Sequence, residues 1–206
     1  MQVSGIVGAP SSTSNPDGNQ PVLLMGKAAE AIVAELHGKW YTACYRGKVF
    51  HGATAITGTI LTVQTTTTAT FLLYNPLGSG VNVEMIATDV GLLGTTSAVI
   101  GTILATLGVG TPGTVTQITA TVNQGLFTGQ SNANQAKLAS AATITAATFF
   151  VPLFNVTSTT AAAVGNLHYD WDGKLVLPPG SYINLSSSPA QTVVSLNSYD
   201  WAEWAI

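Results

Sequence analysis

Apolar and polar residues alternate in several short stretches of the chain after residue 39. Residues 81–85, VNVEM, place apolar side chains at every second position, and residues 117–122, QITATV, do the same. This period of two is typical of a strand with one face in a core and the other in solvent. The pattern therefore predicts antiparallel β-structure in this part of the chain.

Turn signals separate these stretches from further apolar runs of strand length. Residues 75–80, NPLGSG, combine Asn, Pro and Gly, each of which supplies a particular backbone angle, and residues 178–180 form a Pro-Pro-Gly corner. Several short strands separated by turns are typical of a sandwich or barrel and not of βαβ units. Further strands are expected at residues 60–63, 70–74, 147–154, 174–177, 182–186 and 192–196.

One stretch near the N-terminus has a helical period instead. In residues 27–38, KAAEAIVAELHG, apolar residues recur at helical spacing and Gly38 is a natural end. A helix of about three turns is marginal alone, so it should dock on the sandwich or on a neighbouring subunit. Residues 9–21 are rich in Pro, Ser and Asn and bury too little to fold alone. We expect residues 1–38 to form a flexible arm plus docking helix, and residues 39–206 a single jelly-roll-like antiparallel β-sandwich.

An uncharged segment at residues 90–110, VGLLGTTSAVIGTILATLGVG, is about as long as a membrane span, roughly 20 residues. It contains many Gly and Thr residues, has no Lys or Arg near either end, and lies in a strand-rich chain. We therefore expect no membrane contact. Residues 93–108 fit either a strand pair or a short buried helix.

The composition narrows the classes of partner. The chain is 46% hydrophobic and 7% charged, against a usual charged share of about 25%, so Thr, Ser, Asn and Gln must cover much of the surface. A net charge of −3 with six basic residues leaves no basic stripe for nucleic acid.

Cys44 is the one cysteine, which excludes an intrachain disulfide, and we expect it to be a small buried residue. The N-terminus lacks the pattern of a secretory signal.

Candidate catalytic and metal-binding residues are sparse. His37, His51 and His168 lie far apart in the sequence, whereas a zinc site usually takes three or four His, Cys or carboxylate ligands. Neither a G-x-S-x-G elbow nor a Cys-His signature is present, and the Gly-rich segments lack the Lys and helix of a phosphate loop. We therefore expect no metal, no cofactor and no enzymatic activity.

Asp170 and Asp172 are the one pair of carboxylates that could serve a glycosidase or a calcium loop, since alternate residues of a strand point the same way. A calcium loop needs further oxygen ligands at set positions, and this stretch runs directly into Lys174 and an apolar run. An Asp-Gly pair before such a run is more typical of a turn. We therefore expect a turn here.

The turn at residues 171–173, Trp-Asp-Gly, the apolar strand after it and the Pro-Pro-Gly corner together resemble the jelly-roll arrangement of cupin-like and tumour-necrosis-factor-like folds. The second cupin motif would place Pro and Gly two apart, followed by a metal-binding His. In this chain Pro179 is directly followed by Gly180, and Ile183 falls near the position of that His. The resemblance implies a shape and not a metal chemistry.

Residues 25–52, MGKAAEAIVAELHGKWYTACYRGKVFHG, together with FLLYNP at 71–76, resemble a group of tailed-bacteriophage virion proteins. Those proteins carry a similar helix, a Gly-aromatic start, an Arg-Gly-x-x-Phe strand and a Tyr-Asn-Pro turn ahead of Thr- and Gly-rich strands. The resemblance covers about the first half of the chain and the closing Pro-Gly corner. It implies a trimeric β-sandwich on the surface of the phage head, or on its tail, made in the host cytoplasm.

These expectations favour a non-enzymatic capsid decoration or cement protein, a homotrimer on a shell of major capsid protein. One alternative is a receptor-binding or fibre protein whose exposed loops, such as residues 123–136, bind host glycans. Another is a polysaccharide-cleaving enzyme that uses Asp170 and Asp172. Tyr and Trp are enriched where interfaces concentrate binding energy, so the aromatic C-terminal tail is an expected docking device, as is the N-terminal helix. The residues expected at subunit or capsid interfaces are Leu23, Leu24, Ile32, Val33, Leu36, Tyr199, Trp201, Trp204 and Ile206.

Overall fold

A computed structural model of the chain describes residues 38–63, 67–93, 99–110, 112–117, 122–124, 134–144, 149–158 and 165–206. Residues Thr42–Ile206 form one compact unit. Nearly all the regular structure in the described residues is β-strand, arranged in two antiparallel sheets. The predicted mainly-β sandwich is therefore confirmed.

The first sheet, sheet A, has its longest strands at its centre. Its order is β11-β5-β14-β1-β8, while β12 also pairs with β5 and β2 with β14. The strands of sheet A are β1 (Val49–Ala53), β2 (Thr59–Ile60), β5 (Val81–Leu92), β8 (Val122–Gln124), β11 (Asn166–Asp170), β12 (Val176–Leu177) and β14 (Val194–Ala205).

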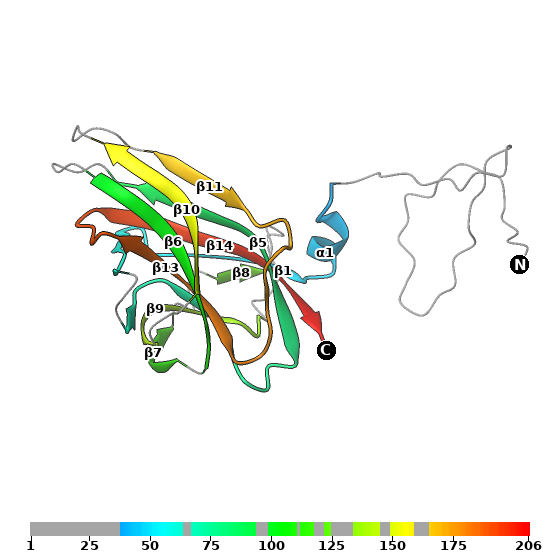
Figure 1. Cartoon of the computed structure of the whole chain (residues 1–206). Helices are drawn as coiled ribbons and strands as arrows, with labels where there is room; N and C mark the ends of the chain where they lie inside the picture. Colours follow the sequence, from blue (N-terminus) through cyan, green and yellow to red (C-terminus); the bar gives the residue numbers. More distant parts are fainter. Residues whose placement is uncertain are drawn as a thin grey trace, which may run out of the picture. The chain divides into compact units, whose positions relative to one another are not determined.

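The second sheet, sheet B, has the order β10-β6-β13-β4-β9-β3, and β7 also pairs with β9. Figure 1 shows the two layers, with β10, β6 and β13 in one and β11, β5 and β14 in the other. The strands of sheet B are β3 (Thr68–Ala69), β4 (Leu72–Asn75), β6 (Val99–Val109), β7 (Gly113–Gln117), β9 (Lys137–Thr143), β10 (Phe149–Ser158) and β13 (Ser181–Ser188).

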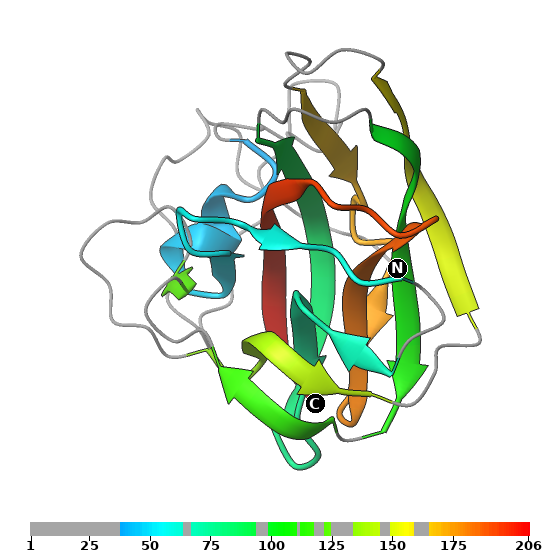
Figure 2. The ribbon, with the colours of Figure 1, turned by 90° about the vertical axis from the view of Figure 1, so that its left-hand side faces the viewer.

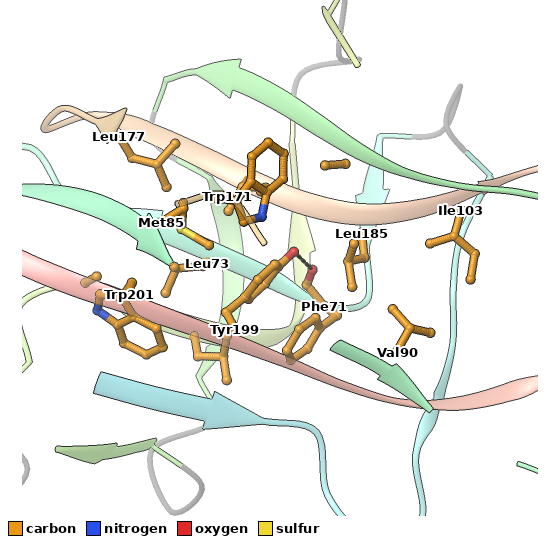
Figure 3. Packing of buried hydrophobic residues seen from close by; sticks show 14 of the residues in the cluster. Phe71, Leu73, Met85, Val90, Ile103, Trp171, Leu177, Leu185, Tyr199 and Trp201 are labelled. Carbon is orange, nitrogen blue, oxygen red and sulfur yellow. Dashed lines mark hydrogen bonds between the residues drawn. The ribbon is translucent and has the colours of Figure 1, made fainter. Parts of the chain in front are cut away.

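Aromatic and aliphatic side chains from the strands of both sheets and from the segments beside them fill the core between the layers (Figure 3). The rings of Phe71 and Tyr199 are stacked with centroids 4.7 Å apart, and Phe50 stacks on Trp201 at 5.9 Å. The buried indole of Trp171 donates a hydrogen bond to Thr88 Oγ1 at 2.8 Å, which satisfies the one polar atom of that side chain. Each buried aromatic ring contributes a large apolar area to folding, so this cluster holds the sheets together.

The uncharged segment contains the long strand β6, which resolves the two alternatives for residues 99–108 in favour of a strand. Its side chains alternate, because Ile103 and Ala105 join the central core while Thr106 points to the other face and bonds with Asn184 of β13. In the described residues no helix is long and apolar enough to cross a membrane.

The helix expected at residues 27–38 lies almost wholly outside the described residues. A short helix, α1 (Tyr41–Tyr45), occurs where the sequence favoured β-structure, so that prediction was wrong. Gly47, with φ of 64°, ends the helix, since Gly47 N–H donates to Cys44 O and Lys48 N–H to Ala43 O. These two bonds form a Schellman motif. The aromatic residues around the helix made the sequence favour β-structure instead.

Candidate interaction surface at one end of the sandwich

The aromatic C-terminal tail belongs to the central strand β14, which pairs with β5 from Ser195 to Ala205 and also with β1. Tyr199 and Trp201 have no exposed surface and point into the core (Figure 3). Their expected place at an interface is therefore corrected, because the strand alternation directs both side chains inward. The expected interface residues Leu23, Leu24, Ile32, Val33 and Leu36 lie outside the described residues, as does His37.

The other two expected residues of the tail do reach the surface. Trp204 is 38% exposed and Ile206 is 73% exposed. The indole N–H of Trp204 donates to Glu84 Oε2 at 2.7 Å, and Ile206 N–H donates to Gly80 O at 3.1 Å. Gly173 lies under the same carboxylate, since a Cβ at Gly173 would come within 2.2 Å of Glu84 Oε1. The exposed indole is thus held in a fixed position.

Three more exposed apolar side chains lie at this end of the sandwich. Leu77 is in the β4–β5 turn, Val109 ends β6, and Val176 opposes Glu84 across β12 and β5. Figures 1 and 2 both place the C-terminus beside the β4–β5 turn and the β12–β13 corner. We call the five residues that share this end the end patch: Leu77, Val109, Val176, Trp204 and Ile206.

The Pro-Pro-Gly corner joins the segments that carry the end patch. Gly180 N–H donates to Asn75 O and Gly180 O accepts from Gly110 N–H, both at 2.7 Å, while Leu77 Cδ2 would lie 2.8 Å from a Cβ at position 180. Ser181 N–H donates to Pro178 O at 3.2 Å, and the φ of Gly180 is 82°. A type II turn needs a positive φ at its third position, which Gly supplies, and Pro is common at its second. The corner is therefore a turn between strands, as predicted.

Glu203 stiffens the same end from inside. It is 4% exposed, and its carboxylate accepts hydrogen bonds from Gln135 N–H at 2.7 Å, Ala136 N–H at 2.9 Å and Trp201 Nε1–H at 3.0 Å. These bonds tie the segment before β9 of sheet B to β14 of sheet A. Glu203 was not expected at this position, and its spacing of two from Trp201 was the available signal that it points inward.

Asp170 and Asp172 form a turn, as predicted. Asp172 N–H donates to Asp170 Oδ1 at 2.8 Å, and Asp172 and Gly173 have φ of 49° and 73°. Trp171 lies between them in the core. One carboxylate thus caps the turn, which is the local hydrogen bond that favours Asp at turns.

The outer face of sheet A carries two His–Asp pairs. His51 Nδ1 lies 2.7 Å from Asp200 Oδ1, and His168 Nδ1 lies 2.7 Å from Asp89 Oδ1. The hydrogen bond to Asp200 raises the pKa of His51 above its usual value, the charges of Asp200 and Asp89 add to this, and partial burial opposes it. In the described residues no three His, Cys, Asp or Glu side chains are grouped so as to hold a metal ion.

Cys44 is half-buried and not fully buried as predicted. Burial and the nearby charge of Asp200 both raise the pKa of its thiol. A nucleophilic cysteine needs the opposite shift, because the thiolate is the reactive form. The surroundings of Cys44 therefore do not favour covalent catalysis.

A small cavity lies at the other end of the sandwich, where β5 ends and β14 begins. Its volume of about 10 Å³ is comparable to the ~10–15 Å³ that one water molecule needs, so it is too small for a sugar or a cofactor. It is lined by Leu61, Leu92, Gly101, Ile103, Val156, Gln191, Val193 and Ser195.

Comparisons of the chain with protein-family models, with curated proteins and with solved structures found no match. The end patch departs from an ordinary polar surface, because exposed apolar side chains from separate segments lie at the same end of the sandwich. Such a surface can bind another protein by burying apolar area.

Proposed function

We propose that this chain is a non-enzymatic structural protein of a bacteriophage virion, a capsid decoration or cement protein that binds as a homotrimer to a shell of major capsid protein. The end patch is the observation that carries the proposal. Leu77, Val109 and Ile206 are each more than 70% exposed, an unusual state for aliphatic side chains gathered at one end of a domain. A protein partner would bury them.

The fixed backbone around the end patch also supports docking. Trp204 is held by Glu84, and the Pro-Pro-Gly corner is bonded to the β4–β5 turn and to the end of β6. Side chains that are already ordered lose little conformational entropy on binding. In a symmetric particle each copy repeats the same contact, so weak contacts add.

The strand pairing supports a jelly-roll arrangement within this proposal. The pairing is clearest when the first strand is matched with the last, the second with the second to last, and so on. The eight strands, in chain order, are β1, β4, β5, β6, β10, β11, β13 and β14. All four matched pairs, β1 with β14, β4 with β13, β5 with β11 and β6 with β10, are antiparallel ladders. A jelly roll is such a set of eight strands divided between two sheets.

Shell binding tests the proposal directly. We expect Val109→Asp to weaken binding to shells assembled from the major capsid protein of the same genome by about tenfold or more, because a charge in an apolar contact has to be desolvated. Ile56→Asp is the matched control: Ile56 is 90% exposed and Val109 85% exposed, but Ile56 lies near the start of β14, at the other end of that strand. Co-sedimentation of each variant with shells measures the difference.

Two outcomes would contradict the proposal. If the wild-type chain does not bind such shells, the protein is not a decoration protein. If both variants weaken binding equally, the end patch is not the surface that binds the shell. Saturable binding of the wild-type chain to host glycans without shell binding would favour the receptor-binding alternative.

A further inference from the structure

The strand β10, Phe149–Ser158, ends the order of sheet B. Among the described residues β6 is the strand that pairs with it, and its other side meets no strand. Such an edge presents backbone N–H and C=O groups that can pair with another strand. The strand of ten residues is long for an edge, since natural proteins often keep edge strands short.

Natural proteins also protect edges with charged side chains, proline or bulges. The sequence of β10, FFVPLFNVTS, contains no charge. It does contain Pro152 and a register irregularity between Pro152 and Phe154. These interrupt the edge at one point and leave residues 149–151 and 154–158 on either side of the interruption.

Phe149 and Phe150 begin this edge, and they are 59% and 45% exposed. Successive residues of a strand point to opposite faces of the sheet, so one ring lies on each face of the sheet beside the edge. A strand added to β10 would bring cross-strand neighbours to both rings and bury apolar area on both faces. The exposed rings and the open backbone therefore favour the same occupant, an extended strand.

The charge distribution favours β10 over sheet A as the place where two copies of this chain could meet. The strands of sheet A carry five acidic residues, of which all but the buried Glu203 are partly or fully exposed, and no Lys or Arg, while the strands of sheet B carry one charged residue, Lys137. Two copies of a chain with net charge −3 repel each other if they meet at sheet A, since like charges placed opposite are destabilising. They meet no such repulsion at β10, so a second copy of this chain fits the uncharged edge.

We propose that β10 is a contact between copies of this chain, with an extended strand of a second copy added to its open edge. The proposal rests on the homo-oligomer of the proposed function and names the contact that forms it. If β10 pairs with β10 of the second copy, the contact is isologous and closes as a dimer. If β10 pairs with a different edge strand, the contact is heterologous and can close as a trimer.

Molar mass measured by light scattering tests this contact. Wild-type chain should have a mass of two or three chains, and Phe150→Lys should raise the dissociation constant by about tenfold or more, because a lysine at an edge opposes strand addition. Ile56→Lys is the control, with an exposed apolar side chain replaced in the turn near the start of β14, and should keep the wild-type mass. Phe150→Thr, which puts an uncharged β-branched residue of high strand propensity in place of the ring, should weaken association less.

The results separate the two proposals. Wild-type chain that stays monomeric at high concentration, or Phe150→Lys that keeps the wild-type mass, would overturn the β10 contact. A dimer weakened by Phe150→Lys would support the contact and contradict the homotrimer. Shell binding of the same samples, measured by co-sedimentation, reports the decoration role independently of the mass.

Discussion

His51 and Asp200 oppose each other in register across β1 and β14, and their side chains are hydrogen-bonded although the residues are 149 positions apart. The bond raises the pKa of His51, and the charges of Asp200 and Asp89 act in the same direction. A group whose folded-state pKa exceeds its unfolded value of about 6.5 stabilises the fold below the unfolded value. That contribution is lost as the pH rises through the folded-state pKa. No sequence pattern could have indicated this pair, because β1 and β14 lie at opposite ends of the sandwich sequence.

The His51 pair predicts a pH dependence of stability. The pair should contribute to the wild-type free energy of unfolding at pH 6, and this contribution should be smaller at pH 8. In His51→Gln the free energy of unfolding should therefore differ less between pH 6 and pH 8. Asp200→Asn is a second variant, because it removes the carboxylate and leaves the imidazole in place. Urea unfolding at both pH values measures the difference. An identical difference in wild type and His51→Gln would contradict the role of the pair.

At the scale of the element, β14 shows where a sequence pattern misleads. Two Trp and one Tyr near a chain end suggested a docking tail, but an end that pairs with two strands can equally be a central strand. The alternation does distinguish its residues, since Tyr199 and Trp201 point inward and Trp204 points outward. The expected strand at 192–196 was correct in place but too short, because a neighbour more than 100 positions away is invisible in the sequence.

Glu203 carries the prediction for this element. Glu203→Ala would leave Gln135 N–H, Ala136 N–H and Trp201 Nε1–H without their acceptor. A buried donor without a partner costs about 1–3 kcal/mol, so we expect a loss of about 3 kcal/mol or more in the free energy of unfolding. Glu203→Gln keeps one oxygen acceptor and should lose less. Urea unfolding measures both, and a loss below about 1 kcal/mol for Glu203→Ala would show that the three bonds do not stabilise the end of the sandwich.

For the whole molecule, the class of fold was predictable from local pattern and the arrangement was not. Alternation and the Pro-Pro-Gly corner were enough to predict an antiparallel sandwich, because period and turn chemistry are local properties. The end patch was predictable only in part. Trp204 and Ile206 stood out in the tail, whereas Leu77, Val109 and Val176 join them only when separate turns converge.

The central proposal is that the sandwich binds a capsid shell through the end patch. A reconstruction by electron cryo-microscopy of shells saturated with the chain tests it most directly. We predict density for a β-sandwich at repeated positions on the shell, with Leu77, Val109, Val176, Trp204 and Ile206 facing the major capsid protein. Undecorated shells, or sandwiches bound with these five residues facing solvent, would contradict it.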